Sequence, residues 1–387
     1  MHDKSGISLI ESDNQQYLIY TYSNLEECWE ALEETKHLFL EASDLKEPIV
    51  VIDGSFEGSV FQHKQEEHRE EAPSNCAAFS KIHTLLSEYR TGPTVLVYGD
   101  ANLKQNYFQW CRDNNSSPIF TRFLYRPQTL LQRSLEFQNL NPTKPNLSFK
   151  PKHFICLNGV ARRHRVEMVN SLYEKDWHLK GYISWLRKGS NSNDGWLSVQ
   201  NHQNFDQTTL KLDFDGDEIN SDSASNGGNQ LLCPPQYREA CFDIVNETSV
   251  SDSVLFITDK TWKPILQKTP FIIHGSKNTH KHLEEYFGIK PYTDLFDYRF
   301  DTLDYKERFA SIKDDNLDIL LNMDINELNE IVNSDKMQEL LEYNKKQLLT
   351  HFIDKPKDIR LLGLSESGIG ENLLTHSIVK PLILLGY

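Results

Sequence analysis

The sequence predicts an α/β protein of two domains. Its 387 residues exceed what one ordinary hydrophobic core takes, so two cores are expected. Short apolar runs alternate with helix-like segments in both halves, as in PIVVIDGS (48–55) and PTVLVYGD (93–100), which lie on either side of a helical pattern. This alternation is typical of a parallel sheet covered by helices. Hydrophobic residues make up 38% of the chain, which suits a folded protein with a substantial core.

Composition limits the classes of function and the compartment. A formal net charge of −15 repels phosphate backbones and disfavours a protein that grips long nucleic acid. The six cysteines form no CxxC pair, as expected of free thiols in a reducing compartment. Residues 1–16 lack the basic-then-apolar pattern of a signal peptide, and no window holds eighteen uncharged apolar residues. We therefore expect a cytoplasmic protein with no membrane span.

A polar connector with three prolines, 140–152, indicates the domain boundary. We expect an N-terminal domain over 1–145, a second domain over 146–320, and a helical segment over 321–387 that packs back on the domains. Residues 187–230, rich in Ser, Asn, Asp and Gly, are expected to form a mobile acidic insertion in the second domain. The stretch DFDGDEINSD within it lacks the spacing of a calcium-binding loop, so we predict no metal site there.

Two predicted strands of the first half end in acids, Asp53 and Asp100. In open parallel sheets the carboxyl ends of the strands face the binding crevice, so both carboxylates stand where a ligand can reach them. The alternative is that both are simply turn residues. His63 and His68 lie nearby, but their spacing lacks the HExxH geometry of a metal site.

The second half carries three polar segments at expected strand ends or helix starts: NGVARRHR (158–165), VNETS (245–249) and Thr-Asp-Lys (258–260). In a doubly wound domain all three would converge on one edge. A helix N-terminus with a lysine suits a diphosphate, and an adjacent acid suits the hydroxyls of a ribose. The alternative is that Thr-Asp-Lys is only an N-cap and ARRHR only a solvated turn. Trp262 and Ile265 should form the inward face of the helix.

The segments 246–276 (NETSVSDSVLFITDKTWKPILQKTPFIIHGS) and 156–172 (CLNGVARRHRVEMVNSL) resemble the donor-binding signature of the fucosyltransferase-type GT-B glycosyltransferases. They look closer still to a group of uncharacterised phage and bacterial proteins. The resemblance covers about 152–300 and departs from the family at several positions, including an Asp where the family has a Glu. It implies a GT-B-like architecture, with two Rossmann-like doubly wound domains facing each other across a cleft and a helical C-terminus.

The resemblance also implies roles for individual residues. Lys260 matches the lysine that binds the donor phosphates, and Asp259 stands where the family has the acid that holds the ribose. Arg165 best matches the phosphate-binding arginine, with Arg162 and Arg163 as alternates. The other expected donor-binding residues are Asn158, Asn246, Glu247 and Thr258.

The activity implied by the resemblance is inverting transfer of a sugar from a nucleotide diphosphate sugar, with a GDP-fucose-like donor favoured, to a hydroxyl of a carbohydrate or other acceptor. A carboxylate of the N-terminal domain would deprotonate that hydroxyl. Asp53 is the first candidate for this base, followed by Glu57 and Asp100. Arg165 and Lys260 would stabilise the charge on the leaving diphosphate. Neither a metal ion nor another cofactor is expected.

Two alternatives stay open at this point. One is a phage glycosyltransferase that modifies a hydroxylated base in DNA, which the acidic net charge disfavours. The other is a catalytically inactive GT-B domain that binds a sugar or a partner protein. Salt-sensitive binding to duplex DNA would identify the first, and the absence of any effect of nucleotide sugars on the melting temperature would favour the second.

Overall fold

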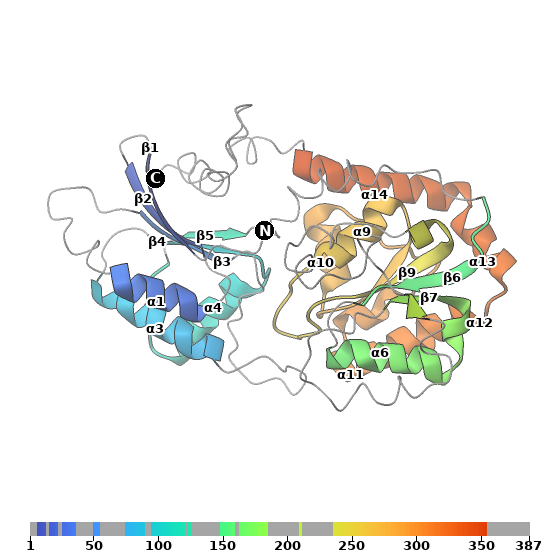
Figure 1. Ribbon diagram of the computed structural model, residues 1–387, viewed down its shortest axis with the longest axis horizontal. Helices are drawn as coiled ribbons and strands as arrows, with labels where there is room; N and C mark the ends of the chain where they lie inside the picture. Colours follow the sequence, from blue (N-terminus) through green and yellow to red (C-terminus); the bar gives the residue numbers. More distant parts are fainter. Residues whose placement is uncertain are drawn as a thin grey trace. The chain divides into compact units, whose positions relative to one another are not determined.

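The structure is a computed structural model, and its elements are shown in Figure 1. It describes residues 6–12, 15–21, 25–35, 49–54, 74–89, 94–120, 122–125, 148–158, 162–184, 209–210 and 235–353. The chain divides into two compact units. The described residues of 130–252 and 257–348 belong to unit 1, and those of 3–129, 253–256 and 349–387 belong to unit 2. The expected acidic insertion contributes only the two-residue strand 209–210 to the described residues.

Unit 2 contains a five-stranded sheet in the order β1-β2-β3-β4-β5. The antiparallel pair β1–β2 lies at one end, and β2 to β5 are parallel. The strands are β1 (Gly6–Ser12), β2 (Gln15–Thr21), β3 (Ile49–Gly54), β4 (Thr94–Tyr98) and β5 (Arg122–Tyr125), and the helices are α1 (Leu25–Thr35), α3 (Ser74–Tyr89) and α4 (Leu103–Asp113).

The crossovers of unit 2 all step in one direction along the sheet. Because parallel crossovers are right-handed, such a sequence of steps places α1, α3 and α4 on the same face, as Figure 1 shows. The described strands therefore form a singly wound sheet, where a doubly wound one was expected. The order of β2 to β5 contains no reversal, so these strands provide no topological switch point.

The core of unit 2 lies between this sheet and its helices. Val50 and Ile52 on β3, and Leu96 on β4, are at most 2% exposed and belong to one apolar cluster. Their spacing of two along a strand brings them to one face of the sheet. The helices supply the other side of the cluster with apolar residues such as Leu32 and Ile82. This packing explains why the alternating pattern of the sequence predicted strands and helices here.

A short segment from the second half of the chain, 253–256, belongs to unit 2. Asp100 holds it: its Oδ1 accepts the N–H of Leu255 at 2.8 Å and the N–H of Asn102 at 2.9 Å. The Asn102 and Asn106 side-chain amides both donate to the carbonyl oxygen of Ser253. The domain boundary expected from the polar connector placed this segment in the second domain. Nothing in the sequence indicated its true place, because its hydrogen-bond partners lie about 150 residues away in the chain.

Unit 1 contains a five-stranded sheet in which every pair is parallel, in the order β10-β9-β6-β7-β8. Its strands are β6 (Lys152–Cys156), β7 (Gly181–Ser184), β8 (Thr209–Leu210), β9 (Ala240–Asn246) and β10 (Phe271–His274). Numbered along the chain, this order is 3-2-1-4-5, that of a Rossmann-like doubly wound fold. The direction of the crossovers reverses between β6 and β9, so the switch point lies between these two strands.

Helices cover both faces of this sheet, with α9 and α10 on one side and α6 and α11 on the other (Figure 1). The helices of unit 1 are α6 (Arg163–Glu174), α9 (Asp259–Gln267), α10 (Thr279–Phe287), α11 (Tyr305–Ser311), α12 (Asp318–Asn322), α13 (Ile325–Val332) and the first part of α14 (Asp335–Ile353). A π-helical stretch, Ile312–Leu317, joins α11 to α12.

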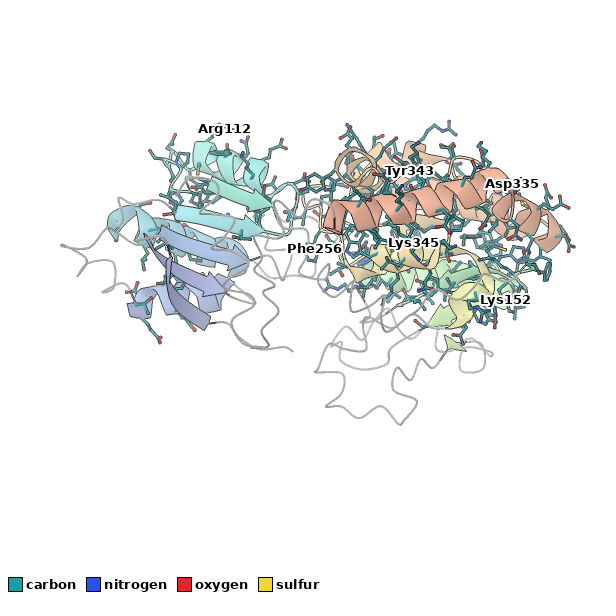
Figure 2. All side chains as sticks on the ribbon, turned by 90° about the horizontal axis from the view of Figure 1, so that it is seen from above. Arg112, Lys152, Phe256, Asp335, Tyr343 and Lys345 are labelled. Carbon is teal, nitrogen blue, oxygen red and sulfur yellow. The ribbon has the colours of Figure 1, made fainter. Side chains whose placement is uncertain are left out.

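The helices after residue 320 are part of unit 1 up to Leu348. Figure 2 shows Asp335 near the start of α14, with Tyr343 and Lys345 further along the same helix. The Asn344 side chain accepts the N–H of Lys290 and donates to its carbonyl oxygen, both at 2.8 Å. The described part of the expected C-terminal helical segment ends with α14 at Ile353, and residues 354–387 lie outside the described residues. None of the helices in the described ranges has the length and apolar character needed to span a membrane.

The interior strand β9 is buried along its whole length and includes an acid, Asp243, which is 2% exposed. Burial raises the pKa of Asp243 to about 7, although the Tyr237 hydroxyl, which donates to it at 2.6 Å, and the charge of Lys263 act in the opposite direction. The folded protein therefore keeps a proton between about pH 4 and pH 7 that the unfolded chain has released. The stability that this proton contributes is full below about pH 4 and is lost as the pH rises through 7.

Replacing Asp243 by asparagine is expected to remove this pH dependence. Between pH 6 and pH 8 the wild-type contribution falls by roughly 1.4 kcal/mol, the value for one proton over one pH unit. Urea unfolding followed by tryptophan fluorescence at both pH values measures the change. The stability difference between pH 6 and pH 8 should shift by about this amount in Asp243→Asn, and an identical difference in both proteins would contradict the assignment.

Candidate functional site

The candidate site lies at the carboxyl edge of the unit 1 sheet, around the switch point between β6 and β9. Ligands of open α/β sheets bind at such points because neighbouring loops diverge to opposite faces there. Asn158 follows β6, Asn246 ends β9, and Glu247 comes directly after it. The sequence predicts that these residues converge on one edge, and the structure brings them together.

A row of buried polar side chains runs along this edge. Asn158 donates from its backbone N–H to Ser184 Oγ at 3.0 Å and accepts from Asn246 Nδ2 at 2.8 Å. Asn246 Oδ1 in turn lies 3.1 Å from His274 Nδ1. All four residues are at most 3% exposed. The row thereby connects the carboxyl ends of β7, β6, β9 and β10, in the order in which the strands lie in the sheet.

Two histidines, one in this row and one next to it, are held in the neutral form. His274 donates from Nδ1 to Asn246 Oδ1, because the amide nitrogen of Asn246 is already directed to Asn158. Burial lowers the pKa of His274 to about 3, and the charges of Arg308 and Arg165 add to the effect. His164 lies edge-on to His274 with ring centres 5.7 Å apart, and burial holds its pKa well below the usual value. Both rings therefore take part in hydrogen bonds without adding charge.

Glu247 is the most highly connected residue of the edge and is 1% exposed. Its carboxylate accepts two hydrogen bonds on each oxygen. Oε1 accepts from Thr258 N at 3.0 Å and Thr261 Oγ1 at 2.6 Å, whereas Oε2 accepts from Thr258 Oγ1 at 2.6 Å and Thr248 N at 3.0 Å. Its backbone carbonyl accepts from His164 Nε2 at 2.8 Å and from Arg165 Nη2 at 3.1 Å.

Two cations from different helices meet at Thr248. Arg162, the N-cap residue of α6, donates from Nη1 to the Thr248 carbonyl oxygen at 3.1 Å. Lys260, in the first turn of α9, places its Nζ 3.5 Å from Thr248 Oγ1 and 3.4 Å from Thr258 Oγ1. The two side chains are partly buried and 98 positions apart in sequence. The N-termini of α6 and α9 therefore bring positive charge to one point.

The other two candidate arginines are placed differently. Arg165 is 3% exposed, and its Nε and Nη2 both point to the carbonyl oxygen of Glu247, so it lies behind the surface of the site. Arg163 points to solvent, with 56% of its side chain exposed, and pairs with Glu167 at 3.1 Å along α6. Of the three arginines, Arg162 is the one whose partly exposed side chain reaches Thr248 together with Lys260.

The Thr-Asp-Lys turn is a helix N-cap as well as part of this edge. Thr258 has an extended backbone and accepts the N–H of Lys260 on its hydroxyl, as N-cap residues do. Asp259 is the first residue of α9, and its side chain lies outside the described residues. Trp262 and Ile265 are 3% and 1% exposed, which confirms the predicted inward face of the helix.

The candidates for the base lie in unit 2 or outside the described residues. Asp53 pairs with Val97 near the carboxyl end of β3, as expected, and only its backbone position is described. Glu57 falls outside the described residues. Asp100 is 0% exposed and binds the N–H groups of Asn102 and Leu255, so its place in the fold is that of a structural acceptor.

Sequence reasoning missed His164, Ser184, Thr248, Thr261 and His274. Three of them carried a usable signal, since Ser184 and His274 end strands and Thr248 adjoins the Asn-Glu pair. The rule that carboxyl ends of parallel strands share one edge would have selected them. Thr261 had no such signal, because its role depends on the distance between α9 and Glu247.

No protein-family model, curated protein or solved structure matches this chain.

Proposed function

We propose that unit 1 binds the diphosphate of a nucleotide sugar at the carboxyl edge of its sheet, beside Thr248. We propose further that the protein is a glycosyltransferase. The observation that carries this proposal is the meeting of Arg162 and Lys260 at Thr248, beside the switch point of a 3-2-1-4-5 sheet. Helix N-termini bind phosphates through their free N–H groups and the positive end of the helix dipole. Two such ends with two cations suit a group that carries two or three negative charges.

In this proposal the cations act on the leaving group. When the bond between the anomeric carbon and the diphosphate oxygen breaks, negative charge accumulates on that oxygen. Arg162 and Lys260 stabilise this charge more strongly than the charge of the intact donor, which lowers the barrier. Asp259, at the start of α9, is proposed to bind the ribose, and a GDP-fucose-like donor is favoured on the motif resemblance given above. The base that deprotonates the acceptor hydroxyl is proposed to be Asp53 or Glu57.

Binding of nucleotide diphosphates and their sugars by the full-length protein tests the proposal. Calorimetric titration with GDP, UDP and dTDP, and with the matching sugar nucleotides, should give saturable binding to at least one of them. Lys260→Ala and Arg162→Ala should each weaken that binding about 10- to 100-fold, since a hydrogen bond to a charged group contributes about 1.5–3 kcal/mol.

Arg163→Ala is the matched control, because it removes the same kind of charge from the solvent-exposed side of the same helix. It should leave the affinity within about threefold of wild type, since exposed charges act weakly through water. Equal losses in Arg162→Ala and Arg163→Ala would show that only overall charge matters. Binding to no nucleotide would refute the proposal, and binding without release of sugar from any donor would favour the inactive alternative.

A further inference from the structure

We infer that Glu247 is a positioning residue, which sets the distance between Arg162 and Lys260 and touches no ligand itself. The inference rests on the proposed function of the site. It departs from the motif resemblance, which groups Glu247 with the donor-binding residues. Three features of the structure carry it: the bonds of the carboxylate, the bonds of the backbone carbonyl and the sign of the Glu247 charge.

The carboxylate is occupied by donors of the protein. Two hydrogen bonds reach each oxygen, and three of the four donors belong to Thr258 and Thr261, at the start of α9. The fourth is the N–H of Thr248. A carboxylate has about four lone-pair sites, so a ribose hydroxyl would have to replace one of these bonds. With 1% of the residue exposed, the carboxylate is withdrawn from solvent as well.

The backbone carbonyl of the same residue holds the other helix. It accepts from His164 and Arg165, both in the first turn of α6 and both at most 5% exposed. One residue thus fixes the N-terminus of α9 through its side chain and the N-terminus of α6 through its main chain. Lys260 follows Thr258 by two positions, and Arg162 precedes His164 by two. The separation of the two cations depends on these contacts.

The charge of Glu247 distinguishes positioning from simple electrostatics. A negative charge beside an anion site weakens anion binding, so removing it should strengthen binding if Glu247 acted through its charge alone. If Glu247 positions the cations, the same change should weaken binding, because small displacements of the cations from their binding geometry lower the affinity by large factors. The two explanations therefore predict changes in affinity of opposite sign. A ribose contact predicts a third outcome, since pyrophosphate contains no ribose.

The test compares inorganic pyrophosphate with the nucleoside diphosphate that binds wild type best. In Glu247→Gln, which keeps the side-chain shape, the affinity for both ligands should fall by about the same factor, 10-fold or more. Titrations are made at 25 °C, after circular dichroism has shown that the variant is folded at that temperature. Unchanged or tighter pyrophosphate binding in this variant would overturn the inference, and a loss confined to the nucleotide would assign Glu247 to the ribose instead.

A second pair of variants keeps the test decisive if Glu247→Gln does not fold. Thr261 is 0% exposed and donates to Oε1, so it reaches Glu247 but no ligand. Thr261→Val should weaken pyrophosphate binding about 3- to 10-fold, whereas Thr261→Ser, which keeps the hydroxyl, should restore the wild-type value. Equal affinities in the two variants would overturn the inference. If wild type binds neither ligand, the proposed function itself fails, and the inference fails with it.

Discussion

Gly181→Ala is expected to destabilise unit 1 by about 3 kcal/mol, toward the upper end for overpacking a core. A Cβ built at Gly181 would lie 2.4 Å from two ring atoms of Phe154, far inside van der Waals contact. Phe154 is 0% exposed and packs near Phe242, so its ring has little room to move. The Gly181 backbone, with φ −143°, is extended and suits any residue. The expected loss is therefore steric.

Chemical denaturation of the full-length protein, followed by tryptophan fluorescence, measures this loss. The double variant Gly181→Ala/Phe154→Leu separates steric crowding from other causes, because the smaller leucine makes room for the new methyl group. It should be more stable than Gly181→Ala alone, a coupling that two independent defects would not show. Additive losses would contradict the steric explanation. Since β7 runs from Gly181 to Ser184, whose hydroxyl accepts the N–H of Asn158, Gly181→Ala should also weaken the nucleotide binding that we propose for this edge.

Arg308→Met is expected to cost about 2–6 kcal/mol, because two backbone carbonyl oxygens would lose the charged donor that satisfies them, at about 1–3 kcal/mol each. The Arg308 guanidinium is 1% exposed and donates to Asp252 Oδ1 at 2.9 Å, to the Val250 carbonyl oxygen at 2.7 Å and to the Leu303 carbonyl oxygen at 2.6 Å. Methionine fills much of the same volume and offers no donor. Buried carbonyl groups would lose their partners, which is the main source of the expected loss.

Arg299→Met serves as the matched control. Arg299 also pairs with an aspartate, Asp297, but 83% of its side chain is exposed. Exposed ion pairs contribute little to stability, so its replacement should lower the free energy of unfolding far less than Arg308→Met does. Unfolding in urea gives both values under the same conditions. Comparable losses in the two variants, or a loss below 1 kcal/mol for Arg308→Met, would show that burial is not what makes Arg308 important.

Much of the fold was predictable because it depends on local patterns. Alternating apolar runs and helical segments indicated parallel α/β architecture, which both sheets confirm in their parallel strands. The order of the strands was not predictable in the same way. Sheet order depends on which strands pair. The local sequence of β2 to β5 does not show that strands consecutive in the chain are also neighbours in the sheet. The described strands of unit 2 therefore form a singly wound sheet, whereas a doubly wound one was expected.

The candidate site shows the same division. Residues at strand ends and helix starts, such as Asn246 and Lys260, were selected from sequence because their neighbours in the chain define those positions. The difference between the arginines at 162, 163 and 165 was not predictable, since all three occur within four residues. The rotation of α6 on the sheet decides that one reaches Thr248, one binds the Glu247 carbonyl and one points to solvent.

The sequence by itself determined that this protein is α/β, where Thr258 would cap a helix, and which cations could serve an anion site. Only the tertiary structure decided that Arg162 and Lys260 meet at one residue, that each Glu247 carboxylate oxygen accepts two donors from the protein, and that Asp100 binds a distant segment of the chain. Propensity, capping and periodicity act over a few residues, whereas hydrogen-bond partners 11 to 155 positions apart are brought together by the folding of the whole unit.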